Sequence, residues 1–363
     1  MRLQLYVLSR TLAGVGAALA VVTSVIMLVD FVDISRTVSG RADVGFPQIA
    51  ELVLLKSPSV ILLLLPFVFL FGAMGAFVAL NRRSELIAMR AAGVSAWRFL
   101  FPAAAAAFVV GVLAVTVLNP SAAAMNGRFE DRRAALTGGD SPASNGEVWL
   151  RQGAPGGQIV IHAGARDTRQ GTLRLRGVSM FIQSVAAAGA VDFTRRIDAD
   201  EAVLMPGYWR LAQAREARPG SESVRSEVLS LPSTLDRRSA MEKYAAPAAV
   251  AFWDLPSTIR SAELAGYSSA AYRLRLQQLL ATPLLLSAMT LVAAAFSLRL
   301  LRLGDLAGLV AAGVALGFAV FLFNQFCGAL GSTDVLPVAL AAWAPPVLAL
   351  LGAVTLLCYT EDG

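Results

Sequence analysis

The chain alternates between long apolar runs and one extended polar block. Six runs are predominantly apolar and reach the length of about 20 residues that a helix needs to cross a bilayer. We expect membrane-spanning helices at Thr11–Val32, Ser59–Leu80, Phe99–Leu118, Leu276–Phe296, Leu306–Cys327 and Val338–Tyr359. Three runs lie before residue 119 and three lie after residue 275, so the residues between them form a single extramembrane insertion.

The polar block contains short runs in which apolar and polar residues alternate. These runs are Val148/Leu150, Ile159/Ile161, Leu173/Leu175, Val178/Met180/Ile182, Val203/Met205 and Trp209/Leu211. Alternation at period two between turn residues such as Pro206-Gly207 is typical of an antiparallel β sandwich or roll. We therefore predict an α-helical polytopic membrane protein with an inserted antiparallel β domain. The predicted parts are residues 1–118 (helices one to three, with a short helix near 82–95), residues 119–256 (the β domain with its linkers) and residues 257–363 (a connecting helix and helices four to six).

The distribution of charged residues predicts how the chain is oriented in the membrane. The chain is 56% hydrophobic and only 15% charged, with a net charge of +6. No aromatic-basic motif accompanies the scattered arginines, so we expect no nucleic-acid partner. Short loops on the side of the termini hold Arg2, Arg10, Arg82, Arg83, Arg90, Arg98, Arg299 and Arg302, whereas the opposite loops hold only Arg36, Arg41 and Lys56. The positive-inside rule then places both termini in the cytoplasm and the β domain in the periplasm of a Gram-negative cell.

Residues for catalysis are scarce. The single histidine, His162, lies in a predicted strand, and no nucleophile-elbow, zinc-protease or phosphate-loop motif occurs. Both cysteines fall in membrane segments. We expect no catalytic residues, no metal site and no cofactor. The centres of the last three spans also lack ionisable residues that would bind a coupling ion, so transport would draw its energy from another subunit.

The loop between the second and third spans predicts a short helix. Ser84 can cap its start, Glu85 lies in its first turn and Gly93 suits its end. Such a helix would present Glu85, Met89 and Ala92 along one side. Two interpretations stay open at this point: Glu85 complements the helix dipole while the arginines fix topology, or the helix docks a partner.

Three stretches resemble the LptF/LptG family, the permease subunits of the lipopolysaccharide export ABC transporter. Arg83-Ser-Glu-Leu-Ile-Ala-Met-Arg-Ala-Ala-Gly93 is similar to the cytoplasmic coupling-helix motif of the family. The stretches Tyr272–Pro283 and Phe323–Gly331 are similar to its fourth and fifth spans. The tripeptide Phe31-Val-Asp33 favours LptG over LptF.

The resemblance implies partners and site residues. The chain would pair with a homologous LptF-like permease, a cytoplasmic LptB-like ATPase dimer and an LptC-like periplasmic protein in the inner membrane, and would pass lipopolysaccharide through β-jellyroll domains. ATPase coupling would fall to Arg83, Glu85, Leu86, Met89 and Arg90. Lipid A phosphates would meet Arg36, Arg41, Lys56 and Arg273, and acyl chains would meet Phe67, Phe318 and Phe321.

Other interpretations also stay open. The basic residues could simply reach toward headgroups, and the phenylalanines could pack or face lipid. Asp30 stands where the family leads us to expect a basic residue, which puts the phosphate contacts there in question. A lipoprotein-releasing permease would have four spans rather than six. A membrane-embedded enzyme acting on lipid-linked envelope precursors at the periplasmic face would need a polar cluster, for which Asp30, Asp33 and Asp43 are the nearest acidic group. In a scaffold without transport, reversing the charge of Glu85 would be silent.

Overall fold

The structure is a computed structural model that divides into two compact units. It describes residues 2–38, 45–137, 148–154, 157–169, 172–185, 191–233, 247–264, 268–300, 306–333 and 335–361. The membrane unit comprises Met1–Leu136, Pro247–Leu255 and Ala270–Gly363, and the sheet unit comprises Thr137–Ala246 and Pro256–Ser269.

The membrane unit is built of long apolar helices. They are α1 (Arg2–Val38), α2 (Phe46–Arg82), α3 (Glu85–Ala91), α4 (Ala96–Leu113), α5 (Asn119–Thr137), α8 (Ala270–Leu300), α9 (Leu306–Ser332) and α10 (Val338–Glu361), with the π-helical η1 (Ala114–Leu118) joining α4 to α5. Among the described residues, six helical paths are long and apolar enough to cross a membrane. The prediction of six membrane helices around an inserted antiparallel β domain is confirmed.

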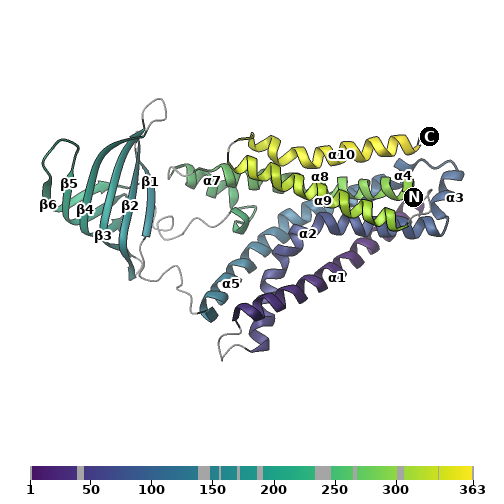
Figure 1. Ribbon diagram of the computed structural model, residues 1–363, viewed down its shortest axis with the longest axis horizontal. Helices are drawn as coiled ribbons and strands as arrows, with labels where there is room; N and C mark the ends of the chain where they lie inside the picture. The colour runs from purple at the N-terminus through teal and green to yellow at the C-terminus, as the bar shows by residue number, and fades with distance from the viewer. Residues whose placement is uncertain are drawn as a thin grey trace. The chain divides into compact units, whose positions relative to one another are not determined.

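Helix α8 forms the centre of the membrane unit. It packs against α2, α4, α9 and α10, and Figure 1 shows it beside α10. In an apolar 18-residue stretch of α8, 72% of the residues are buried, whereas in the corresponding stretch of α1 only 11% are buried. On α1 a stripe at helical spacing is exposed: Val21, Val25, Leu28, Val29 and Val32. An apolar stripe of this kind needs lipid tails or another protein to cover it.

Helices α4 and α8 approach each other closely at one point. A Cβ added to Gly111 would lie 2.5 Å from Cα of Pro283, which is closer than such atoms approach in proteins. Nearby, the hydroxyl of Ser287 donates to the carbonyl of Ala104 across the same interface, at 2.9 Å. Small residues at the crossing therefore let the two backbones meet, as is common between membrane helices.

The sheet unit contains one six-stranded antiparallel sheet. Its strands are β1 (Val148–Ala154), β2 (Gly157–Arg169), β3 (Thr172–Val185), β4 (Val191–Met205), β5 (Tyr208–Ala217) and β6 (Val224–Pro232), and they pair in sequence order. Among the described strands this is a meander, without the crossed connections of a Greek key. One face forms the core, which includes the fully buried Ile161, Leu175, Met180, Ile197 and Trp209.

The alternation pattern missed parts of this sheet. Leu173/Leu175 and Val178/Met180, expected in two runs, lie in the single strand β3, whose buried positions shift by one residue at Gly177, where φ is +61°. At the end of the alternation along β4, Ala202 and Leu204 are buried, whereas Val203 and Met205 are only partly buried. Alanine is weakly apolar and gives little alternation signal, so the run Val203/Met205 does not mark the buried face of β4.

The sheet curls until its edges meet at Gln152 of β1. The Trp209 Nε1–H donates to Oε1 of Gln152 at 3.1 Å, and the hydroxyl of Ser233 donates to the same oxygen at 2.9 Å. The side-chain amide of Gln152 donates in turn to the carbonyl of Pro232 at the end of β6, at 3.1 Å. Because β1 and β6 are the two ends of the strand order, these bonds join the sheet's opposite edges.

Two short elements follow the sheet, η2 (Pro247–Ala249) and α7 (Leu255–Leu264). The turn between them is tied to the junction of η1 and α5. The backbone N–H of Phe252 donates to Oδ1 of Asn119 at 2.9 Å, and Nε1–H of Trp253 donates to the carbonyl of Thr116 at 3.0 Å. The π-helical turn is thus stabilised by the segment that returns from the β domain to the membrane helices.

Candidate functional site

The short helix α3 ends as the sequence predicts but begins differently. Gly93, with φ of +78°, donates its N–H to the carbonyl of Arg90, and Val94 donates to that of Met89. These two bonds form a Schellman motif, which uses a left-handed residue to end a helix. At the other end, Ser84 has a left-handed φ of 58° and its hydroxyl makes no capping bond, so the expected Ser84 cap is wrong.

The faces of α3 differ from the predicted ones. Leu86 and Met89 are buried in the core that the membrane helices share, so Met89 is not presented beside Glu85 as expected. The exposed large apolar residue is instead Ile87, which is 60% accessible. The helix is therefore anchored to the bundle by one side and shows Ile87 on the other.

The charged residues of α3 lie at its edges. Arg83 is exposed, and Arg90 and Glu85 are partly buried. One carboxylate oxygen of Glu85, Oε2, is enclosed without a hydrogen-bond partner in the described part of the chain. A buried carboxylate oxygen without a donor costs free energy.

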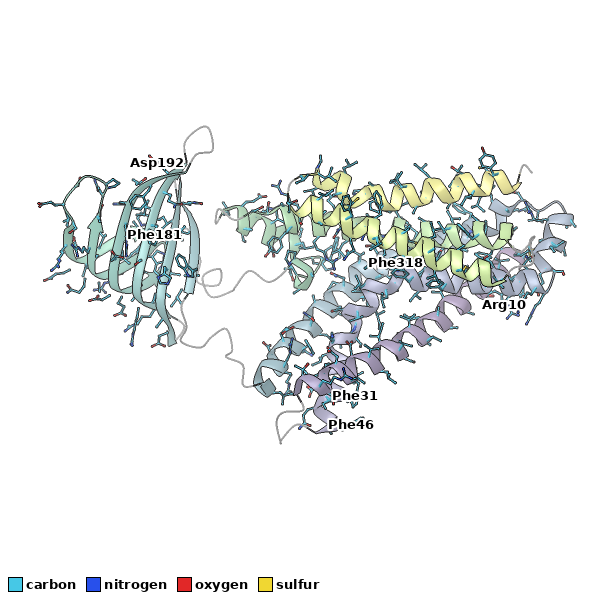
Figure 2. All side chains as sticks on the ribbon, in the orientation of Figure 1. Arg10, Phe31, Phe46, Phe181, Asp192 and Phe318 are labelled. Carbon is cyan, nitrogen blue, oxygen red and sulfur yellow. The ribbon has the colours of Figure 1, made fainter. Side chains whose placement is uncertain are left out.

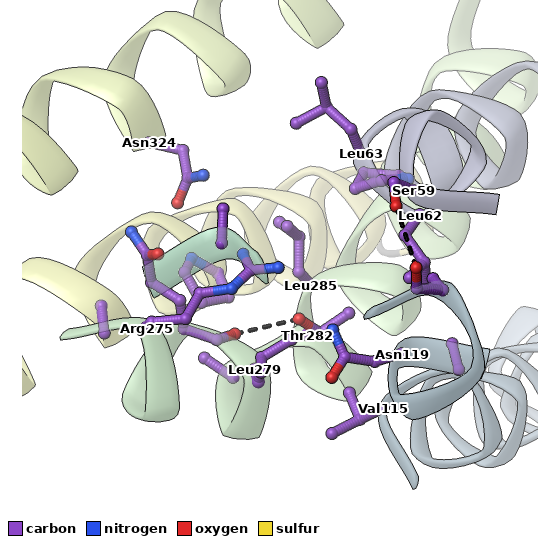
Figure 3. Close-up of a pocket in the computed structure, with 18 of the residues that line it drawn as sticks. Ser59, Leu62, Leu63, Val115, Asn119, Arg275, Leu279, Thr282, Leu285 and Asn324 are labelled. Carbon is purple, nitrogen blue, oxygen red and sulfur yellow. Dashed lines mark hydrogen bonds between the residues drawn. The ribbon is translucent and has the colours of Figure 1, made fainter. Parts of the chain in front are cut away.

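A cavity of about 310 Å³ lies at the opposite end of the membrane unit. It is lined by residues of α2, η1, α5, η2, α8, α9 and α10, and Figure 3 shows its walls. Ser59, on its α2 wall, precedes the end of α2 at Arg82 by 23 residues, which corresponds to roughly 35 Å along the helix. The polar lining residues are Ser59, Asn119, Arg275, Gln278, Thr282, Asn324 and Gln325.

Arg275 is the charged residue among the described lining residues, and the sequence interpretation did not select it. Figure 3 shows its guanidinium directed into the cavity. The chosen residue, Arg273, is exposed on the same helix, since residues two apart point in different directions around a helix. The fourth span was also expected to begin at Leu276, whereas α8 begins at Ala270 and brings Arg275 inside it. Its position within an apolar helix was the signal available in the sequence.

The other basic candidates have different surroundings. Lys56 donates to Oδ1 of Asp30 at 2.7 Å, so its charge is already compensated within the chain. The second oxygen of Asp30 is buried with no hydrogen-bond partner in the described residues. Arg36 is exposed on α1. Arg41, like Asp43, lies outside the described residues.

Two of the three aromatic candidates come together. The rings of Phe67 on α2 and Phe321 on α9 lie 5.7 Å apart and line a smaller apolar cavity of about 50 Å³. Phe318 lies on α9 as well (Figure 2), but its side chain is 56% accessible and it does not line this cavity. The smaller cavity shares Leu63, Pro66, Leu285 and Asn324 with the larger one.

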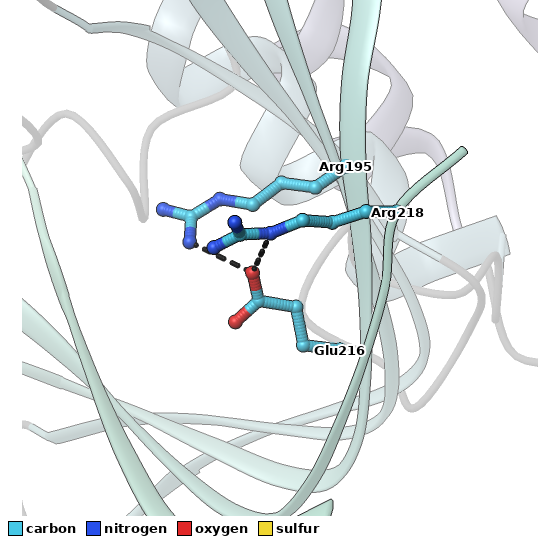
Figure 4. Close-up of polar contacts among 3 residues, drawn as sticks. All are labelled: Arg195, Glu216 and Arg218. Atoms are coloured by element: carbon cyan, nitrogen blue, oxygen red, sulfur yellow. Dashed lines mark hydrogen bonds and ion pairs between the residues drawn. The ribbon is translucent and has the colours of Figure 1, made fainter. Parts of the chain in front are cut away.

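The sheet unit carries an ion-pair cluster and the single histidine. Arg195 and Arg218 both donate to Oε1 of Glu216, at 3.1 and 2.9 Å (Figure 4). Burial raises the pKa of Glu216, but the hydrogen bonds and charges of the two arginines outweigh it and hold the pKa below its ordinary value. The His162 ring packs against Trp149, with centroids 4.4 Å apart and ring planes tilted by 42°. Within the described residues no group of three or more metal-ligating side chains is present.

Six membrane-crossing helices with one inserted antiparallel sheet define a polytopic membrane protein with a β domain. The family model of the lipopolysaccharide export system permease LptF/LptG matches residues 5–359, nearly the whole chain. The chain belongs to the LptF/LptG family and is a permease component of a transport system. The match does not separate LptF from LptG, so the assignment to LptG stays a prediction. The sequence matches none of the curated proteins compared with it.

Proposed function

We propose that the chain is a permease subunit of an ATP-driven exporter that extracts lipopolysaccharide from the outer leaflet of the inner membrane and passes it to a periplasmic β-jellyroll bridge. The observation that carries the proposal is the family match together with α3, a short helix fixed to the bundle on one side and open on the other. ATP hydrolysis belongs to a separate subunit, an LptB-like ATPase dimer.

The proposed orientation follows from charge. Arg82, Arg83, Arg90 and Arg98 surround α3. Both chain ends lie at the α3 end of the bundle (Figure 1), and Gln4 donates to the carbonyl of Arg98 there, at 3.0 Å. The positive-inside rule makes this end cytoplasmic. The cavity then faces the periplasmic side, and the sheet domain, inserted between α5 and η2, would be periplasmic.

The burial of α3 suggests how it would couple. Leu86 and Met89 are 1% and 8% exposed, and both pack in the core that contains Phe99 and Leu80. A partner that moves α3 would therefore move α2 and α4 with it, because packed cores transmit displacement instead of absorbing it. Contact with the ATPase would fall to Arg83, Glu85 and Ile87, while Leu86 and Met89 would transmit the motion.

Partners and cargo follow from the uncovered surfaces and the family. The apolar stripe on α1 fits a homologous LptF-like permease or the acyl chains of lipopolysaccharide between the two subunits. Arg36, Arg41 and Arg273 remain the proposed contacts for lipid A phosphates on the outer side, with Phe67, Phe318 and Phe321 as contacts for acyl chains. An LptC-like protein would receive the cargo with the sheet domain.

Co-purification of the tagged chain from its native membrane tests the ATPase contact. We expect the wild-type chain to recover an ATPase subunit. Glu85→Arg and Ile87→Arg should each lose most of it at normal membrane levels, because one reverses the contact charge and the other places a charge in the apolar contact. The matched control is Val335→Arg, which alters a residue of similar accessibility (66% against 60%) in the connection between α9 and α10.

Two results would count against the proposal. A wild-type chain that recovers no ATPase removes the exporter assignment. Equal loss in Val335→Arg would show that the two α3 variants act through membrane insertion or folding and not through a contact at α3.

A further inference from the structure

We propose that the cavity around Arg275 is an anion site within a single subunit, built to hold the phosphate group of an amphiphile. The structure brings four observations together there: a guanidinium whose Nε is enclosed, carboxamide side chains, a missing counter-charge and an adjoining apolar cavity.

The guanidinium of Arg275 lacks an anion in the described part of the chain. Its Nε atom is enclosed with no hydrogen-bond partner, and no described residue forms an ion pair with it. The described lining residues include no aspartate or glutamate. Arginine keeps its charge in proteins, and an enclosed charge is costly unless it is paired. An anion from outside the chain would supply the missing partner.

The polar walls suit a phosphate group. Asn119, Gln278, Asn324 and Gln325 carry side-chain amides that can donate hydrogen bonds, and the guanidinium can give two parallel bonds to one phosphate. Asn119 already accepts a hydrogen bond from Phe252 through Oδ1, so its amide nitrogen is the group that faces other partners. A cluster of donors around one cation matches an anion with several acceptor oxygens.

The apolar walls indicate that the phosphate belongs to an amphiphile. Leu63, Pro66, Leu285 and Asn324 line both this cavity and the smaller one between Phe67 and Phe321. With its head group beside Arg275, an amphiphile could place its apolar part in the adjoining cavity of the same unit. A free phosphate ion would use only the polar part.

The inference deepens the proposed function and rests on it for the biological source of the amphiphile. Its test does not depend on the ATPase. If the wild-type chain recovers no ATPase but binds dodecyl phosphate, only the exporter assignment is refuted. If it recovers the ATPase but does not bind dodecyl phosphate, only the phosphate site is refuted.

Binding of dodecyl phosphate to the full-length chain in neutral maltoside micelles tests the site, with inorganic phosphate in a parallel titration. We expect Arg275→Met to raise the Kd for dodecyl phosphate by roughly 10- to 100-fold, the range for losing a charge-assisted, bidentate contact. Arg275→Lys keeps the charge but cannot make the two parallel bonds. Its Kd for dodecyl phosphate should lie between those of wild type and Arg275→Met. The control Arg128→Gln, at an exposed arginine on α5 outside the cavity, should stay within about twofold of wild type.

A thermal unfolding curve without ligand separates binding from folding. Arg275→Met should unfold at the wild-type temperature or above it, since replacing an enclosed unpaired charge by an apolar side chain is often neutral or stabilising. The phosphate site is overturned if wild type does not bind dodecyl phosphate or if Arg275→Met binds it equally well. If inorganic phosphate binds as tightly as dodecyl phosphate, the inference that the bound phosphate belongs to an amphiphile is refuted.

Discussion

Replacing Gln152 by methionine removes the polar group that joins the two edges of the sheet while it keeps the length of the side chain. Gln152 is 1% exposed and Trp209 is 0% exposed, so water cannot replace the lost acceptor. A buried donor left unpaired costs about 1–3 kcal/mol, and the carbonyl of Pro232 also loses its donor. Methionine recovers a little apolar burial, which leaves a net loss of about 2–4 kcal/mol.

Hydrogen exchange of the full-length chain, read by mass spectrometry, measures this loss where it occurs. Exchange from a folded segment reports its local opening, so a loss of 2–4 kcal/mol should speed exchange in β5 and β6 by roughly 30- to 700-fold. The control Gln158→Met breaks a bond of 2.6 Å to Gln183, but both residues are partly exposed and water can replace it. It should change exchange by less than about tenfold. Exchange in β5 and β6 that stays within about threefold of wild type in Gln152→Met would refute the role of this residue.

Three further changes test packing and charge. Gly111→Ala should lower the thermal unfolding temperature by the equivalent of about 1–3 kcal/mol, because the added methyl group meets the backbone of Pro283. The control Gly75→Ala, where an added Cβ meets no atom within 4 Å, should leave the unfolding temperature unchanged. Equal effects of the two changes would contradict the close approach of α4 and α8. Glu216→Gln should destabilise the sheet unit near neutral pH, which faster hydrogen exchange would show. The difference from wild type should vanish as the pH falls below the ordinary carboxyl pKa of 4.5 and through the lowered pKa of the folded state. A difference that persists at low pH would rule out the charge of Glu216 as its cause. Lys56→Met should lower the unfolding temperature by leaving Asp30 enclosed and unpaired, and adding Asp30→Asn should restore much of the loss; no recovery in the double variant would show that the ion pair is not responsible.

The beginning and end of α3 show how far local signals reach. Gly93 predicts the helix end correctly, because only the local backbone decides whether a left-handed residue is needed there. The buried side of a seven-residue helix is a different matter. Its five apolar positions fit more than one face, and the packing of α3 into the core of the membrane unit buries Leu86 and Met89 and leaves Ile87 outside.

The cavity shows the same limit at long range. Arg273 and Arg275 are equivalent in the sequence, two arginines at the start of an apolar helix. Only the arrangement of α2, α9 and α10 around α8 determines that Arg275 turns inward beside Asn119 and Asn324. Likewise, the ion pair of Lys56 with Asp30 joins residues 26 positions apart on two helices, and it changes the meaning of both residues as site candidates.

The sequence by itself determined the six membrane helices, the inserted antiparallel domain and the family, because long apolar runs and strand alternation reflect the solvent that each segment meets. The tertiary structure decided which side of each element is buried, how the sheet closes through Gln152 and Trp209, and which arginine enters the cavity. These depend on contacts between residues far apart in the chain, whose energies no local pattern of polarity records.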